Sequence, residues 1–248
     1  MFWLNVGASL TASVFFVALT IGIGILVLVI RRRALLRFWG IREVKKIRIY
    51  ISHLRIIQGG ALDAADTPRS YQGSVVTQLE SEMGALLKSL FFAIVPGKAV
   101  QPGWIQALLL VSADVEVQPA PGQVQQIDQK GTIVSLGSPG YNVVSGAIET
   151  DCDSPVKFLQ GNTTIQLPGN VIITNPCQSV VVRLLSGDRY WFYAAGLSEA
   201  GTAAAAHYLA KSWKHLDRRY RQSPSFFVAI ESFGNDYRNT RVFSEAAL

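Results

Sequence analysis

Two glycine-rich loops carry the residues whose types and spacing could bind an anionic ligand. Residues 137–142 read Gly-Ser-Pro-Gly-Tyr-Asn between a short apolar strand and a short helix, and residues 196–202 read Gly-Leu-Ser-Glu-Ala-Gly-Thr before a longer helix. Glycines let backbone N–H groups approach an anion, and the following helix directs the positive end of its dipole there. Hydroxyl and amide side chains on the loops add hydrogen-bonding groups. The candidate ligand-binding residues are Gly137, Ser138, Gly140, Asn142, Gly196, Ser198, Gly201 and Thr202.

Each loop also has a simpler interpretation, as a turn that only caps a helix. No lysine follows the glycines as it does in a P-loop, and the spacing differs from the dinucleotide-binding fingerprint. Ligands of α/β sheets bind at the carboxyl ends of strands, where both loops are expected. The pair therefore favours a small phosphate-bearing ligand, without identifying it.

Arg69 and Tyr71 are further candidates, because they lie at the start of the helix expected over residues 71–92. The arginine could clamp a phosphate and the tyrosine could stack on a base. The alternative is that Arg69 is a solvated surface residue. The histidines and the two cysteines lack the ligand spacing of a metal site, so we expect no metal and no cofactor.

The N-terminal segment is expected to anchor the chain in a membrane. Residues 8–30 carry no charge, and this run is long enough to span a bilayer and longer than the apolar core of a signal peptide. Residues 31–48 then hold eight Lys and Arg residues against Glu43 alone, in a chain of net charge +6. The rest of the chain is therefore close to neutral, which argues against a nucleic-acid-binding surface. The basic cluster indicates a topological anchor that also attracts anionic lipid.

The basic cluster also predicts the orientation of the chain. By the positive-inside rule, we expect a single-pass inner (plasma) membrane protein with its N-terminus outside and its C-terminal domain in the cytoplasm. Cys152 and Cys177 fit a reducing compartment. Gly22 and Gly24 are two residues apart, whereas small residues that form a helix–helix interface are four apart. The helix therefore gives no signal for a homo-oligomer, and homo-oligomerisation stays an open possibility.

The remaining pattern predicts an α/β fold, a Rossmann-like sheet with an antiparallel β insertion, preceded by one transmembrane helix. Residues 105–117 fit a helix, a strand, or one followed by the other. Short runs between residues 156 and 185 predict the antiparallel patch. Strands are expected over residues 47–57, 131–136, 190–195 and 225–230, and helices over residues 71–92, 142–148 and 203–220. The expected divisions are an anchor over 1–33, a basic juxtamembrane linker over 34–46, the ligand-binding domain over 47–240 and a tail over 241–248.

The two loops and the order of strands and helices over residues 47–232 resemble a SLOG-type Rossmann-like domain. This resemblance implies a nucleotide-derived ligand and a role as an enzyme or as a sensor coupled to a membrane effector in bacterial defence. Enzymatic members carry Gly-Gly-x-Gly-Thr-x-x-Glu, whereas Gly201-Thr202 is followed here by alanines, with Ala205 in place of the glutamate. The resemblance therefore implies binding without hydrolysis.

Three functions follow as hypotheses. The first is a membrane-anchored sensor that binds a nucleotide or another phosphate-bearing molecule at the two loops. The second is a nucleotide-processing enzyme, acting on an N-glycosidic or phosphate bond, with Glu199 or Glu149 as its acid or base. The third is a non-catalytic membrane scaffold whose loops are only turns.

Overall fold

A computed structural model describes residues 2–41, 46–52, 54–57, 72–75, 77–92, 114–159, 162–233 and 236–248. The helices are α1 (Phe2–Phe38), α2 (Gln78–Phe92), α4 (Val143–Asp151) and α5 (Glu199–Arg219), with a 3-10 turn at Val124–Gln126. The strands are β1 (Lys46–Ile51), β2 (Leu54–Ile57), β3 (Gln72–Val75), β4 (Asp114–Pro119), β5 (Thr132–Leu136), β6 (Lys157–Leu159), β7 (Thr164–Leu167), β8 (Val171–Ile173), β9 (Gln178–Ser186), β10 (Arg189–Gly196), β11 (Phe226–Phe233) and β12 (Asp236–Ala247).

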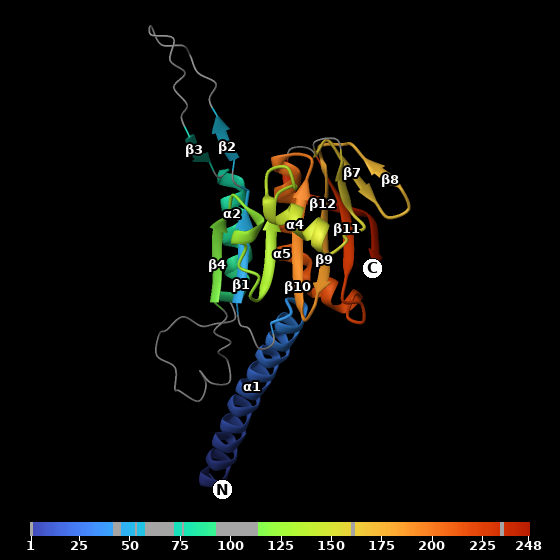
Figure 1. Ribbon diagram of the computed structural model, residues 1–248. Helices are drawn as coiled ribbons and strands as arrows, with labels where there is room; N and C mark the ends of the chain where they lie inside the picture. The colour runs from blue at the N-terminus through green and yellow to red at the C-terminus, as the bar shows by residue number, and fades with distance from the viewer. Residues whose placement is uncertain are drawn as a thin grey trace, which may run out of the picture.

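A mixed seven-stranded sheet forms the centre of the domain, in the order β12-β11-β9-β10-β5-β1-β4 (Figure 1). Strands β10, β5, β1 and β4 run parallel to one another, whereas the β10–β9, β9–β11 and β11–β12 pairs are antiparallel. A separate antiparallel sheet of β6, β7 and β8 lies between α4 and β9 in sequence. The prediction of a Rossmann-like α/β fold with an antiparallel insertion is confirmed.

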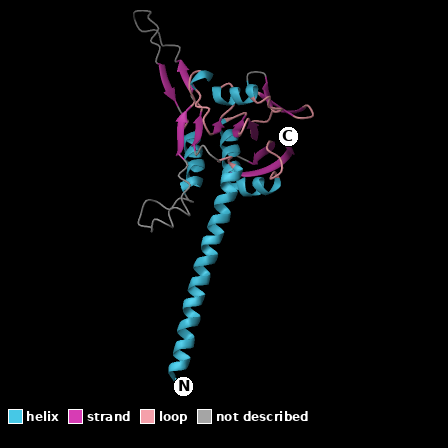
Figure 2. Cartoon of the chain, turned by 60° about the horizontal axis from the view of Figure 1, so that its bottom comes forward, coloured by secondary structure: helices cyan, strands magenta, loops and turns pink. Residues whose placement is uncertain are grey.

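Both faces of the sheet are covered, which explains why its central strands are almost continuously apolar. Alternate residues of the strands point to opposite faces. One face packs on α2, α5 and the end of α1, through residues such as Val134 and Phe192. The other packs on α4 and the three-stranded sheet, through residues such as Ile133 and Trp191. Figure 2 shows the strands between these layers, with α1 projecting away from the domain.

Two segments near the first strand differ from the sequence prediction. The strand expected over residues 47–57 is interrupted after Ile51, and β2 pairs with β3 in a separate two-stranded sheet. The helix expected from residue 71 begins at Gln78, because the Thr77 hydroxyl accepts a hydrogen bond from the Glu80 N–H at 3.3 Å. Thr-x-x-Glu is the spacing of a capping box, which marks a helix start.

Three further boundaries also differ. Residues 114–119 form β4, so the part of the 105–117 run that the structure describes is a strand. Helix α5 begins at Glu199 rather than at residue 203, because Ser198 is its N-cap. The expected tail over residues 241–248 is instead the second half of the edge strand β12, which pairs with β11 up to Ala247.

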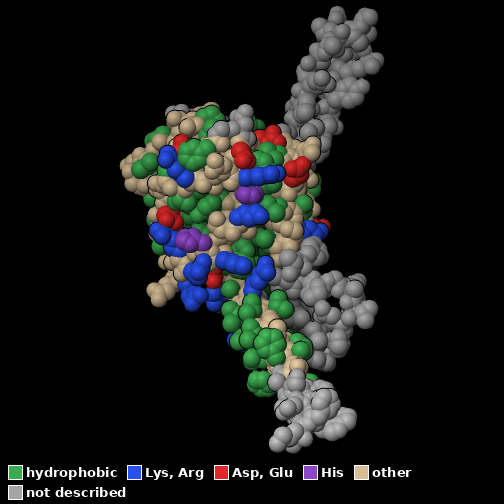
Figure 3. Space-filling view, turned by 180° about the vertical axis from the view of Figure 1, so that it is seen from behind, with side chains coloured by type: hydrophobic (Ala, Val, Ile, Leu, Met, Phe, Trp, Pro, Cys, Tyr) green, Lys and Arg blue, Asp and Glu red, His purple; other side chains and the backbone are tan. Residues whose placement is uncertain are grey.

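Helix α1 is exposed and apolar along its outer part and enters the core of the domain at its end. Side chains from Val14 to Ile30 lie at the surface, and Figure 3 shows them as an apolar rod leaving the domain. This exposed apolar helix fits a single membrane anchor or a signal sequence. The helix stops where Gly40 adopts a φ of +64°, a conformation that favours glycine.

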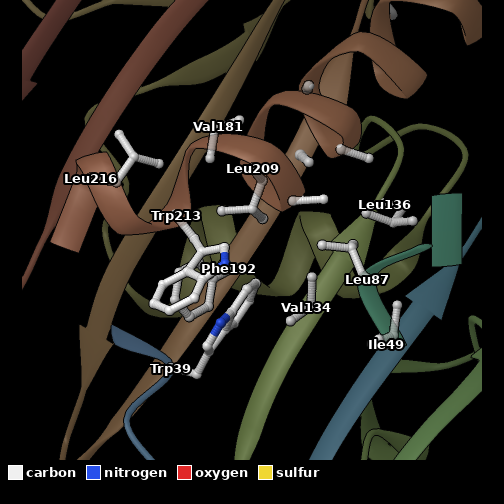
Figure 4. Close-up of a cluster of buried hydrophobic side chains, with 14 of the residues drawn as sticks. Trp39, Ile49, Leu87, Val134, Leu136, Val181, Phe192, Leu209, Trp213 and Leu216 are labelled. Carbon is white, nitrogen blue, oxygen red and sulfur yellow. The ribbon is translucent and has the colours of Figure 1, made fainter. Parts of the chain in front are cut away.

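Residues 34–41 are thus part of the core rather than a linker. Phe38 and Trp39 are both fully buried. The Trp39 ring lies 4.7 Å from that of Phe192 (centroid to centroid), and Phe38 lies 6.2 Å from Trp213 of α5. Figure 4 shows Trp39, Phe192 and Trp213 packed together. Because the end of α1 is embedded in this way, the direction in which α1 leaves the domain depends on the packing around Phe38 and Trp39.

The basic cluster expected over residues 31–48 is divided between different environments. Arg48 is buried on β1 and lies within 3.5 Å of carboxylate oxygens of Asp114, Glu116 and Asp128. It therefore forms an internal charge cluster at the edge of the sheet, and it does not belong to a membrane-facing collar.

Candidate functional site

The two predicted glycine loops line one cavity of about 590 Å³. This volume lies in the range of small-molecule sites. Ser52 follows β1, Gly137 and Ser138 follow β5, and residues 196–198 follow or end β10, so the cavity lies at the carboxyl ends of three parallel strands. The lining also includes Thr77, Glu80, Tyr141, Asn162, Thr163, Thr174, Pro176, Glu199 and Thr202.

The cavity lies where neighbouring strands send their helices to opposite faces. After β1 the chain reaches α2, which packs on the same face as α5. After adjacent β5 it reaches α4 on the other face. Divergent connections of this kind open a crevice at the carboxyl edge of an α/β sheet, the usual position for a ligand.

The loop after β5 has one group that faces the cavity and several that hold the loop in place. Gly137 has a φ of +107°, and a Cβ there would lie 1.9 Å from the Ser52 hydroxyl oxygen. The Gly140 N–H donates to Asn162 Oδ1 at 3.1 Å. Ser138 is buried, and its hydroxyl and backbone N–H have no hydrogen-bonding partner among the described residues. Ser138 is therefore the clearest ligand-facing donor of this loop.

Asn142 has the structural role that the simpler interpretation of this loop predicts, as the N-cap of the following helix. Its side chain is 1% exposed, accepts from the Val144 N–H as the N-cap of α4, and donates to the Leu136 and Tyr50 carbonyls. Its amide holds the loop between β5 and α4, rather than being free for a ligand as expected.

The loop after β10 is folded tightly against the start of α5. The Ser198 hydroxyl accepts from the Gly201 N–H and donates to the Pro176 carbonyl. Thr202 is buried and lines the cavity, and its hydroxyl accepts from the Gly196 N–H at 3.2 Å, so it positions the loop, while Ser198 is the N-cap of α5. A Cβ at Gly196 would lie 2.5 Å from the Gly201 carbonyl carbon, which explains the glycine.

Glu80 is the cavity residue that the sequence analysis missed as a site residue. It is 5% exposed, and its Oε2 accepts from the Ser52 N–H at 2.9 Å. Burial raises the pKa of its carboxyl, hydrogen bonds from Ser52 oppose that shift, and the Glu199 carboxylate reinforces it. The Thr77-x-x-Glu80 capping box would have marked this residue as the start of a helix, although not as part of a cavity.

The charge around the cavity combines two carboxylates with helix N-termini. Among the described lining residues there is no lysine or arginine, while Glu80 and Glu199 are both acidic. These two residues lie in the first turns of α2 and α5, whose positive ends face this edge. The first-turn N–H groups of a helix have no carbonyl partners within it. Here the Thr77 and Ser198 hydroxyls accept from the Glu80 and Gly201 N–H groups, so only the N–H groups before these two can face a ligand. The cavity can therefore accept a ligand that has both an anionic part and hydroxyl groups.

Several other predicted residues fall elsewhere. Arg69 and Tyr71 lie outside the described residues. Glu149 is not among the described residues that line the cavity, and its carboxylate accepts from the Phe158 N–H. A second hollow of about 840 Å³ is lined by residues 139–143 together with residues 120–123 and Gln126. Over the described part of the chain, no group of three His, Cys, Asp or Glu side chains is arranged to hold a metal ion.

Comparisons with protein-family models, with curated proteins and with solved structures found no match to this chain.

Proposed function

We propose that this chain is a membrane-anchored sensor whose α/β domain binds a nucleotide or a related phosphate-bearing small molecule. The observation that supports this proposal is the single cavity lined by both glycine loops, at the point where the connections of β1 and β5 diverge. Adjacent parallel strands bring both loops to this edge, and the cavity between the loops gives that edge the space and the polar lining that a small ligand needs.

The groups around the cavity favour a ligand with two chemically different parts. The Ser138 hydroxyl and N–H, together with the positive ends of α2 and α5, suit a phosphate. The carboxylates of Glu80 and Glu199 suit donors such as the hydroxyl groups of a sugar. A sugar phosphate unit, as in a nucleotide, has both.

An anchor is favoured over a cleaved signal sequence by the way in which α1 ends. The helix continues without interruption from Phe2 to Phe38, and its last turn is buried in the core. The arginines at positions 31–33 then favour an outside N-terminus and a cytoplasmic domain. Alkaline extraction of membranes tests the anchor, and a cytosol-dependent reporter fused at the C-terminus tests the orientation.

Helix α5 gives the cavity a physical connection to α1. Glu199 and Thr202, at its beginning, line the cavity, and Asp217, near its end, forms an ion pair with Arg37 of α1. A ligand that prefers one position of α5 would therefore bias the direction of α1, provided that its affinity differs between the two positions.

The two carboxylates of the cavity also favour a second candidate, a nucleotide-processing enzyme. A buried carboxyl with a raised pKa, such as Glu80, is a common feature of an acid or base catalyst. Incubation with NAD and nucleoside monophosphates separates the candidates. Product formation that is lost in Glu80→Gln or Glu199→Gln favours the enzyme, whereas binding without product favours the sensor.

Calorimetry of the full chain in detergent, against nucleoside mono-, di- and triphosphates, cyclic nucleotides and NAD, tests the proposal. We expect saturable heat with at least one of these, and about 10- to 100-fold weaker binding in Ser138→Ala, the effect of one lost hydrogen bond to a charged group. Ser81→Ala, at an exposed position of α2, is the matched control. No heat from any compound with a folded protein would contradict the proposal.

A further inference from the structure

The end of the domain from which α1 leaves carries basic side chains from a second helix. Lys214 and Arg218 are exposed and four residues apart on α5, so they lie on one face of that helix, and exposed Arg221 follows in the next turn. Figure 3 shows Lys and Arg side chains gathered where the apolar rod of α1 joins the domain. We call Lys214, Arg218 and Arg221 the α5 basic stripe.

Helix geometry places the α5 basic stripe close to the membrane surface. The uncharged part of α1 ends at Ile30, and Arg37, seven residues later, pairs with Asp217, the neighbour of Arg218. At 1.5 Å per residue the separation along α1 is about 10 Å. Headgroups extend roughly 5–7 Å beyond the hydrocarbon on each side, and their potential decays over a Debye length of about 8 Å. The stripe therefore lies within the electrostatic reach of the headgroups.

The positive charge of the stripe is not neutralised within the described part of the domain. Two nearby arginines do have carboxylate partners: Arg37 of α1 pairs with Asp217, and Arg219 of α5 pairs with Glu245. No described carboxylate lies within ion-pair distance of Lys214, Arg218 or Arg221. The negative end of the α5 dipole accounts for a cation in the last turn, but not for Lys214 earlier in the helix or for Arg221 beyond it.

We propose that the α5 basic stripe binds anionic lipid headgroups, so that the domain rests on the membrane at two places, α1 and the end of α5. This inference goes beyond the ligand-binding function and rests only on α1 spanning a bilayer. It also changes the interpretation of the cluster over residues 31–48, because Arg37 and Arg48 of that cluster are paired within the domain. The lipid contact would hold α5, whose other end lines the cavity, at a fixed height above the membrane.

Native mass spectrometry of the full chain in mixed micelles tests this contact. The micelles contain equal amounts of anionic phosphatidylglycerol and zwitterionic phosphatidylcholine, and the ratio of the two lipids retained is measured. The variant Lys214→Gln/Arg218→Gln/Arg221→Gln removes the stripe. The control Lys157→Gln/Arg238→Gln/Arg241→Gln removes the same charge from β6 and β12. Thermal unfolding checks that both variants remain folded.

We expect the wild type and the control to retain phosphatidylglycerol in excess. In the stripe variant, the ratio of retained phosphatidylglycerol to phosphatidylcholine should be at least tenfold lower. Each basic residue near an anionic surface contributes about fivefold in affinity, so three residues allow for such a loss. An unchanged preference in the folded stripe variant would overturn the proposal. So would equal retention of the two lipids by the wild type, or binding of a single-stranded oligonucleotide to the stripe with no lipid preference.

Discussion

Arg37 of α1 and Asp217 of α5 form an ion pair in which the Arg37 Nε donates to Asp217 Oδ1 at 3.0 Å. The two residues lie 180 positions apart in the chain. Their pairing joins the last turn of the apolar helix to the helix whose first turn lines the ligand cavity. It is therefore a direct polar connection between the proposed membrane anchor and the helix that lines the proposed sensor site.

Replacing Arg37 with glutamine should destabilise the domain, because it leaves the Asp217 carboxylate, which is 5% exposed, without its charged partner. A broken buried pair costs about 3–5 kcal/mol, but the Arg37 side chain is half-exposed, so we expect about 1–2 kcal/mol. Denaturant unfolding in micelles measures this free energy. Arg33→Gln, at an exposed position of the same helix, is the control, and equal stability of the two variants would contradict the prediction.

Arg183 should be irreplaceable by lysine. Its guanidinium is buried and donates to the Phe38, Tyr220, Ser223 and Pro224 carbonyls, and burial lowers its pKa to about 10. A lysine ammonium cannot donate to all four carbonyls with the planar geometry of a guanidinium. We expect Arg183→Lys to lose about 2–4 kcal/mol of unfolding free energy through carbonyls left unpaired. A loss below about 0.5 kcal/mol in the same unfolding measurement would show that the guanidinium geometry is not needed.

Gly137→Ala should impair both folding and ligand binding. The φ of +107° and the 1.9 Å approach of a Cβ to the Ser52 hydroxyl oxygen both oppose a side chain there. The backbone strain alone costs about 1–3 kcal/mol. Gly122→Ala is the matched control, because nothing lies within 4 Å of its Cβ position and its φ is not positive. Thermal unfolding should show a clear loss only for Gly137→Ala, and similar curves for both variants would refute the explanation.

Glu80→Gln should stabilise the unliganded protein at neutral pH. The pKa of Glu80 is raised in the folded state, so the unfolded chain holds fewer protons at this group, and stability falls as pH rises from the ordinary carboxyl range through the raised value. Glutamine removes this penalty and still accepts from the Ser52 N–H. Melting temperatures of the two proteins should therefore diverge as pH rises above the ordinary range of a carboxyl and converge below it. A difference that is independent of pH would count against burial as the cause.

The parts of the structure that were predicted correctly rest on local signals. The strands leading into both glycine loops, the helices after them and the antiparallel patch each have their own periodicity or turn residues. The parts that were missed depend on distant partners. The Glu80 carboxylate receives the Ser52 N–H from 28 residues away, and Phe38 is held by Arg183 from 145 residues away. Strand β12 was missed because it alternates between polar and partly buried residues, without the apolar run of a central strand.

The central claim is that the cavity between the two loops holds a phosphate-bearing ligand, and native mass spectrometry of the gently purified full chain tests it most directly. We predict a small phosphate-containing molecule bound in a 1:1 ratio to the wild type and to Ser81→Ala, and bound at much lower occupancy to Ser138→Ala. A folded wild type that carries no such molecule, and that captures none from a metabolite extract, would contradict the claim.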